Sequence, residues 1–166
     1  NLEQAIGYFQ RVRQIFTCDT FPDKWATTQQ NLGVAYIHRI RGQQAENLEQ
    51  AIHYFQEALE ICTRDTHPND WAMIQTNLAN AYRYRLMHKR VDNLEQARFY
   101  AEQASQIYTK TAFPENWART QNSLAAIYLE RIQGDRADNL DRTIYCSQEV
   151  IENCDRDAFS EQWAQA

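Results

Sequence analysis

A strict internal repeat constrains this sequence more than any other feature. Four tryptophans, each followed by alanine, stand 46 residues apart (71 − 25 = 46). They are Trp25, Trp71, Trp117 and Trp163. The same register aligns Asn1-Leu2-Glu3-Gln4-Ala5 with the segments that begin at Asn47, Asn93 and Asn139. A period of this length indicates a repeat array in which each copy stacks on its neighbours.

The repeat defines the expected organisation of the chain. We expect one continuous array of three complete units and one partial unit, which breaks off soon after the fourth tryptophan. The units are 1–46, 47–92, 93–138 and the partial unit 139–166. We therefore expect the chain to be a segment of a longer protein.

Each unit is predicted to contain two helices. The apolar residues of the second copy fall at spacings of three and four, which is typical of a helix with one buried face. They are Leu48, Ala51, Ile52, Phe55, Ala58, Leu59 and Cys62. Asn47 is the expected N-cap of this helix, with Gln50 returning a hydrogen bond to it.

The second helix of the unit is expected to begin near Pro68, because proline is tolerated in a first turn. It should run past Trp71 and Tyr82 to Leu86 and end before Asp92. The chain has only four glycines and three prolines, too few for the many turns of a sheet-rich protein. We therefore expect an all-α fold with about seven long helices.

Composition excludes several classes of function. The sequence is 43% hydrophobic and 23% charged, as in folded soluble proteins. Its net charge of −5 argues against a nucleic-acid partner, which needs a clustered positive surface. No apolar run approaches the roughly 20 residues that span a bilayer, and no signal segment opens the chain. We therefore expect a cytoplasmic protein with no membrane or nucleic-acid partner.

Chemistry-bearing residues show no shared pattern. The four histidines fall at unrelated phases of the repeat, and neither a zinc-protease motif nor a phosphate-binding loop occurs. These histidines are His38, His53, His67 and His88. The four cysteines lack paired spacing and are expected to be small buried packing residues. We therefore predict that the chain is not an enzyme and holds no cofactor or metal.

At this point the residues resemble a known family. Asn31-Leu32-Gly33-Val34-Ala35-Tyr36 and the run from Ala51 to Leu59 look like the two helices of a tetratricopeptide repeat, and related runs begin at Asn77 and Ser123. The usual unit has about 34 residues, so each copy here is longer. The longer unit resembles arrays in bacterial, often cyanobacterial, multidomain proteins, where they accompany caspase-like (CHAT), nucleotide-binding or kinase-like domains.

The resemblance implies a fold and a binding face. The fold is a right-handed α-solenoid of antiparallel helix pairs, and partners lie on its concave face, which the second helix of each unit lines. Carried over position by position, the candidates in the first copy are Gln30, Asn31, Val34, Ile37, His38 and Arg41. Those of the second copy are Thr76, Asn77, Asn80, Arg83, Tyr84 and Met87. Those of the third copy are Asn122, Ser123, Ala126, Leu129, Glu130 and Gln133.

The middle set is the most informative of the three. Asn77, Asn80 and Arg83 keep one helical face with Tyr84 beside them, so amides and a guanidinium could hold a peptide backbone or carboxylate. In related arrays, asparagines and basic residues on this face hold peptide termini. The lysine usual there is missing here.

Positions that repeat between copies favour structure over binding, because every joint between units must be made in the same way. We expect the tryptophans to fill the joints rather than to form an aromatic binding stripe. Gln29, Gln75 and Gln121 should bond backbone groups at loops or helix ends. The recurring Arg39, Arg85 and Arg131 are open to two interpretations, a row that grips a ligand or ion pairs with Glu3, Glu49, Glu95 and Asp141.

Two functions from different classes remain. The first is an interaction module that binds a protein or peptide partner in its groove, as a scaffold or sensor in a larger protein. The second is an architectural spacer or a self-associating solenoid without a groove ligand. End-to-end self-association is expected from an apolar face at Leu2, Ala5 and Ile6 and from Trp163 near the other end. Variation along the groove between copies favours the first function.

Overall fold

The computed structural model describes residues 1–154 and Ala164, and this part of the chain contains seven α-helices and no strand. The helices are α1 (Leu2–Ile15), α2 (Pro22–Ile37), α3 (Gln44–Leu59), α4 (Pro68–Tyr84), α5 (Arg90–Ser105), α6 (Pro114–Glu130) and α7 (Arg136–Asn153). The expected all-α class with about seven helices is confirmed for these residues. Trp163, expected at a joint and near the self-associating end, lies outside them.

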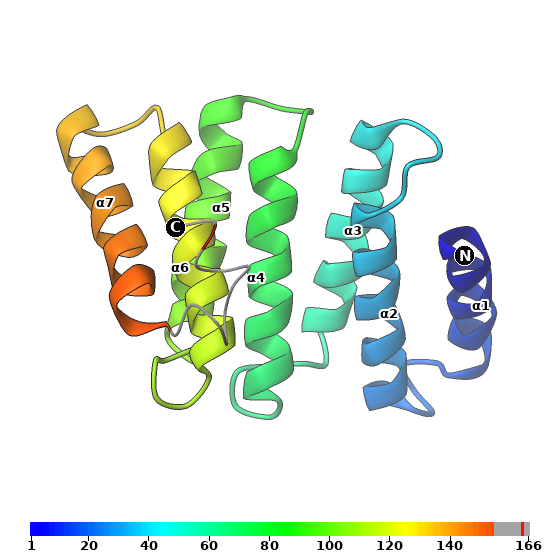
Figure 1. Ribbon diagram of the computed structural model, residues 1–166. Helices are drawn as coiled ribbons and strands as arrows, with labels where there is room; N and C mark the ends of the chain where they lie inside the picture. Colours follow the sequence, from blue (N-terminus) through cyan, green and yellow to red (C-terminus); the bar gives the residue numbers. More distant parts are fainter. Residues whose placement is uncertain (155–163, 165–166) are drawn as a thin grey trace.

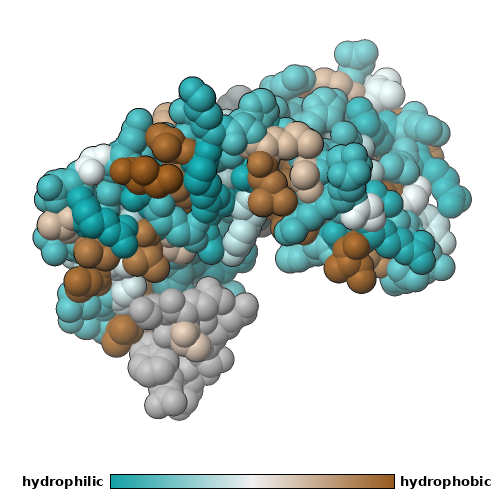
Figure 2. All heavy atoms as spheres, turned by 90° about the horizontal axis from the view of Figure 1, so that it is seen from above, coloured by the Kyte–Doolittle hydropathy of each residue, from teal (hydrophilic) through white to brown (hydrophobic). Residues whose placement is uncertain are grey.

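The helices stand side by side in chain order (Figure 1). Every helix contacts the next one along the chain, and α4 also contacts α2 and α6. Among the seven described helices, the backbones of α1, α3, α5 and α7 do not approach one another closely, although the Arg13 guanidinium of α1 donates to the Glu57 carboxylate of α3 at 3.3 Å. The helices α2, α4 and α6 therefore form an inner row. Figure 2, seen from above, shows the molecule hollowed on the side that faces the viewer in Figure 1.

The helices of the inner row begin at prolines, as the sequence predicts. Pro22, Pro68 and Pro114 each occupy the first turn, where a missing N–H costs no helical hydrogen bond. The loops before them are closed by threonines, with hydroxyl–hydroxyl distances of 2.8 Å at Thr17–Thr20 and at Thr63–Thr66. The far end of α4 differs from expectation, because the helix ends at Tyr84 and leaves Leu86 exposed in the following loop.

The predicted N-cap role of the repeated asparagines is wrong in three copies. The helices α3, α5 and α7 begin three residues earlier, so Asn47, Asn93 and Asn139 lie inside the first turn and are buried. The Asn47 amide donates to the carbonyls of Arg39 and Arg41, at 3.1 and 2.9 Å. These are carbonyls at and beyond the end of α2, which have no helical partner. Only Asn1 caps its helix, by accepting a hydrogen bond from the Glu3 N–H.

The same bond recurs after α4 and α6. The Asn93 amide donates to the carbonyls of Arg85 and Met87, and the Asn139 amide donates to that of Gln133. Each buried asparagine therefore fixes the loop that returns the chain from the inner row to the outer row. A buried amide has to be bonded in every copy, which explains why this residue type repeats.

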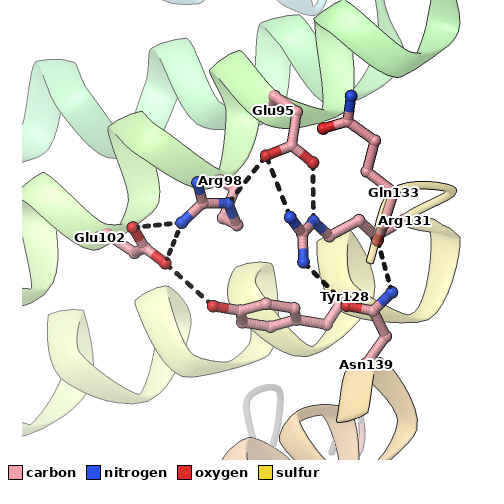
Figure 3. Close-up of polar contacts among 7 residues, drawn as sticks. All are labelled: Glu95, Arg98, Glu102, Tyr128, Arg131, Gln133 and Asn139. Carbon is pink, nitrogen blue, oxygen red and sulfur yellow. Dashed lines mark hydrogen bonds and ion pairs between the residues drawn. The ribbon is translucent and has the colours of Figure 1, made fainter. Parts of the chain in front are cut away.

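Each repeated arginine lies just after the end of an inner helix and forms an ion pair with a glutamate of the preceding outer helix. Arg39 binds Glu3, Arg85 binds Glu49 and Arg131 binds Glu95, each through two nitrogens of its guanidinium. In Figure 3 the third of these pairs extends to Arg98, Glu102 and Tyr128. The ion-pair interpretation of these arginines is confirmed. We call each Asn–Arg–Glu set a clasp.

The clasps hold their carboxylates in the charged form. The hydrogen bond from Arg85 lowers the pKa of Glu49 below its ordinary value of 4.5, against the opposing effect of burial. Burial is the largest influence on Glu95 and raises its pKa, but hydrogen bonds from Arg131 and Arg98 outweigh it and lower the pKa overall. Each clasp is therefore strongest when its glutamate is ionised.

The core is built from positions that repeat in the sequence. Trp25 and Trp117 are buried and Trp71 is half-buried against the core, so the predicted packing role is confirmed for these three. The prediction for Gln29 is wrong, because its amide donates to the Glu57 carboxylate rather than to backbone. Glu57 lies on α3, which packs against α2, so its carboxylate reaches Gln29.

The closest approach between two helices involves Gly33 of α2 and Phe55 of α3. A Cβ atom on Gly33 would lie 2.5 Å from the Phe55 ring, which is fully buried. In the second copy both equivalent positions hold alanine, at Ala79 and Ala101, and both of these are buried. The same space is therefore filled by glycine with phenylalanine in one joint and by two alanines in the next.

Two further expectations concern single residues. Ile6 was expected in an open apolar face, but it is buried and Leu2 packs against the same core. The reason is that α2 covers this side of α1. The cysteines are free, three of them are buried, and burial raises the pKa of the Cys62 and Cys146 thiols to about 11. They serve as apolar packing residues, as predicted.

Candidate functional site

A pocket of about 320 Å³ lies between the three inner helices. The residues that line it come from α2, α4 and α6. The middle helix α4 supplies more of the lining than either neighbour, because it is the one helix of this row that contacts both of the others. The pocket is therefore centred on the second copy of the repeat.

The pocket brings together many of the residues predicted to bind a partner. Those from α2 are Val34, Ile37 and His38. Those from α4 are Thr76, Asn77, Asn80, Arg83 and Tyr84. Those from α6 are Asn122 and Ser123. The predicted face of the middle helix is thus nearly complete at this site.

The other predicted residues do not line the pocket. Gln30 is buried, while Asn31, Arg41 and Leu129 are exposed elsewhere, and Ala126 is half-buried. Met87 and Gln133 follow the ends of α4 and α6, where their carbonyls belong to the clasps. A helical face could not be extended to these two residues because the helix stops before them. Glu130 lies at the end of α6 and pairs with arginines rather than lining the pocket.

Sequence reasoning missed Arg119 of α6, which lines the pocket. The predicted set of the third copy begins at Asn122, one turn too late. The equivalent residues are Thr27 and Met73, so the position varies as strongly as those that were predicted. Its spacing of three and four from Asn122 and Ser123 was the signal that could have identified it.

The basic side chains that line the pocket are two arginines and a histidine. They are Arg83, Arg119 and His38, and no carboxylate is among the lining residues. The Arg83 guanidinium lies 4.4 Å from the centre of the Tyr84 ring, and its Nε donates to Glu130 at 3.2 Å. Arg90 at the start of α5 binds the same carboxylate. Glu130 therefore stands beside the pocket as the counter-ion of two arginines.

The polar groups of the pocket offer both donors and acceptors. The Ser123 hydroxyl donates to the side-chain carbonyl of Asn80 at 3.2 Å, and both residues line the pocket. The Thr76 hydroxyl is used within the helix, where it donates to the Ala72 carbonyl. Such a surface can bind a peptide backbone, because each peptide unit presents one donor and one acceptor.

A smaller pocket adjoins the main one between α4 and α6. It shares Thr76, Asn77 and Arg119 with the main pocket and reaches Tyr108. Burial raises the pKa of Tyr108 to about 12, and its hydroxyl donates to the Asn69 carbonyl. The neutral ring of Tyr108 therefore closes this end of the site.

Two findings concern other kinds of site. Within the part of the chain that the structure describes, no group of three or more histidine, cysteine, aspartate and glutamate side chains could hold a metal ion. None of the helices between residues 1 and 154 combines the length and apolar composition needed to cross a membrane.

Comparison with family models, curated proteins and solved structures finds no match to this chain.

Proposed function

We propose that this chain is part of a right-handed, tetratricopeptide-like solenoid and binds a peptide or protein partner along α2, α4 and α6. One observation carries the proposal. The residues of the clasps are the same in each copy, whereas the residues that line the pocket change from copy to copy.

The contrast is sharp when equivalent positions are compared. Asn80 and Arg83 of the second copy correspond to Val34 and Ile37 of the first. All four line the same pocket, so side chains of different chemistry meet at one site. Joint positions are fixed by contacts that every copy must make, and these pocket positions are free of that requirement. Variation on such a face is what recognition of one particular ligand requires.

The proposed role is binding rather than catalysis, in the cytoplasm, as a scaffold or sensor within a larger protein. The pocket supports this role with amide, guanidinium and aromatic groups that are suited to peptide contacts. The competing role is that of a spacer, whose inner face would need no particular chemistry.

Peptide-display selection tests the proposal. The chain is immobilised and selected against a random peptide library, in parallel with a groove variant that carries Asn77→Ala, Asn80→Ala, Arg83→Ala and Tyr84→Ala. We expect the parent to retain peptides that the groove variant does not. A matched control carries Gln50→Ala, His53→Ala, Gln96→Ala and Phe99→Ala on exposed positions of α3 and α5, and it should retain them all.

Circular dichroism at equal concentration checks that the three proteins have equal helicity. Retention of the same peptides by the parent and the groove variant would contradict the proposal. Failure of all three proteins to retain any peptide would favour the spacer role.

A further inference from the structure

The charge of the pocket is opposite to that of the chain. The sequence has a net charge of −5, yet the charged side chains that line the pocket, Arg83 and Arg119, are both positive. The pocket is walled by apolar and amide groups of three helices, which focus the positive potential into it. An acidic ligand is therefore drawn to this site although the protein as a whole is acidic.

The two arginines of the pocket are in different states. Arg83 is bound to Glu130, which also binds Arg90, so much of its charge is already compensated. Arg119 is exposed on α6, and no hydrogen bond or ion pair holds its guanidinium among residues 1–154. A ligand carboxylate can reach Arg119 directly, but it has to displace Glu130 to reach Arg83.

We propose that the pocket binds an aspartate or glutamate side chain of a peptide, with Arg119 as its anchor and Glu130 as an internal competitor at Arg83. This inference rests on the proposed peptide-binding function and adds the chemistry of the ligand. Glu130 was predicted from sequence to contact the partner. Here it opposes an acidic partner, because it satisfies the arginine that the partner would otherwise bind.

The two roles predict opposite effects of removing charge. Arg119→Gln removes a charge-assisted hydrogen bond and should weaken binding of an acidic peptide about tenfold or more. Glu130→Gln frees Arg83 and should strengthen binding several-fold, about threefold to tenfold. Both effects should shrink at high salt, since exposed charges are screened beyond about 10 Å at 0.1 M ionic strength.

The experiment uses the full chain and a pool of random dodecapeptides that are acetylated at the N-terminus and amidated at the C-terminus. Retained peptides are sequenced by mass spectrometry, and the frequency of aspartate and glutamate is compared with that of the input pool. A second pool has free C-termini. Affinities of the most enriched peptide, and of its Glu→Gln or Asp→Asn analogue, are then measured by fluorescence anisotropy for each variant.

We expect the blocked pool to be enriched in acidic residues, with the enrichment lost in Arg119→Gln and increased in Glu130→Gln. Arg11→Gln is the matched control, because Arg11 is exposed on α1 and contacts only Tyr8 among the described residues. It removes the same charge far from the pocket and should change nothing.

The outcomes separate this inference from the proposed function. Enrichment of apolar or basic peptides that depends on the pocket would overturn the inference and leave peptide binding standing. Enrichment confined to the pool with free C-termini would overturn the claim that a side-chain carboxylate is bound, in favour of a terminal carboxylate. Weaker binding by Glu130→Gln would show that Glu130 contacts the partner and would also overturn the inference. No enrichment in either pool would overturn both proposals.

Discussion

The clasps join the ends of the inner helices to the outer helices, the pocket lies between the inner helices, and the two follow opposite rules. At the clasps, Asn47, Asn93 and Asn139 of the outer helices are buried and donate to loop carbonyls in the same way. In the pocket, valine and asparagine occupy equivalent positions of successive copies, at Val34 and Asn80. The difference teaches that repetition along this sequence reports the contacts between units, while variation reports what the units present to a partner.

The first prediction has the largest effect and concerns the joint between α2 and α3. Phe55→Ala should lower the free energy of unfolding by about 3 to 5 kcal/mol, because it empties a fully buried ring site. Gly33→Ala should cost about 1 to 3 kcal/mol, because its Cβ would overlap the Phe55 ring. Urea unfolding measures both.

The double variant sharpens this prediction. With Phe55→Ala in place, Gly33→Ala should be neutral or stabilising, because the second copy tolerates the pair Ala79 and Ala101. Costs that simply add in the double variant would show that the two positions do not share one volume.

The second prediction compares an asparagine of a clasp with an asparagine of the pocket. Asn93→Ala should cost about 1 to 3 kcal/mol of unfolding free energy, because the carbonyls of Arg85 and Met87 lose their donor. Asn77→Ala should change it by less than about 0.5 kcal/mol, because Asn77 lines the open pocket. Chemical unfolding followed by circular dichroism distinguishes them. Equal losses would erase the distinction between clasp and pocket.

The third prediction concerns pH and the clasp of Glu49 with Arg85. The pKa of Glu49 is lowered in the folded protein, so the folded state binds a proton less readily than the unfolded state. The pair therefore stabilises the fold above the ordinary glutamate pKa of 4.5, and this stability is lost as the pH falls through the lower folded value.

Glu49→Gln should cost about 1 kcal/mol at about pH 7 and nothing at the acid end of the range. Unfolding curves across the acid range measure the difference. Glu46→Gln, which alters an exposed carboxylate on the same helix, serves as the control and should leave the pH dependence unchanged. A loss with Glu49→Gln that persists at low pH would contradict the ion-pair explanation.

The smallest effect is expected at Arg119. Arg119→Gln should leave the free energy of unfolding within about 0.5 kcal/mol of the parent, because the side chain is exposed and packs against no clasp. A differential thermal scan of parent and variant is sufficient. A marked loss of stability would make Arg119 a structural residue and remove it from the proposed anchor role.

Much of the fold was predictable because its signals are local and repeated. The prolines at 22, 68 and 114 mark the starts of α2, α4 and α6 in three independent copies. The starts of α3, α5 and α7 were misplaced because their true caps share no residue type. Only Asp135 accepts capping hydrogen bonds there, from the N–H groups of Ala137 and Asp138. The repeated asparagines instead donate hydrogen bonds to loop carbonyls, which no local sequence pattern reveals.

The site was predictable in its centre and less so at its ends. Asn77, Asn80 and Arg83 were found because a helical spacing of three places them together, and α4 is flanked on both sides. Met87 was placed on this face in error because the point at which α4 ends depends on the clasp. The pairing of Glu130 with Arg83 and Arg90 joins three helices, and sequence spacing alone does not contain it.

One measurement tests the central claim most directly, by exchanging pocket residues between copies. The variant carries Asn80→Val, Arg83→Ile and Tyr84→His, so that the second copy presents the residues that the first copy holds at these positions, Val34, Ile37 and His38. Unfolding free energy and affinity for the selected peptide are measured on the same preparation. The account predicts unchanged stability, within about 1 kcal/mol, and loss of peptide binding. Unfolding of the array, or full affinity in the exchanged protein, would contradict it.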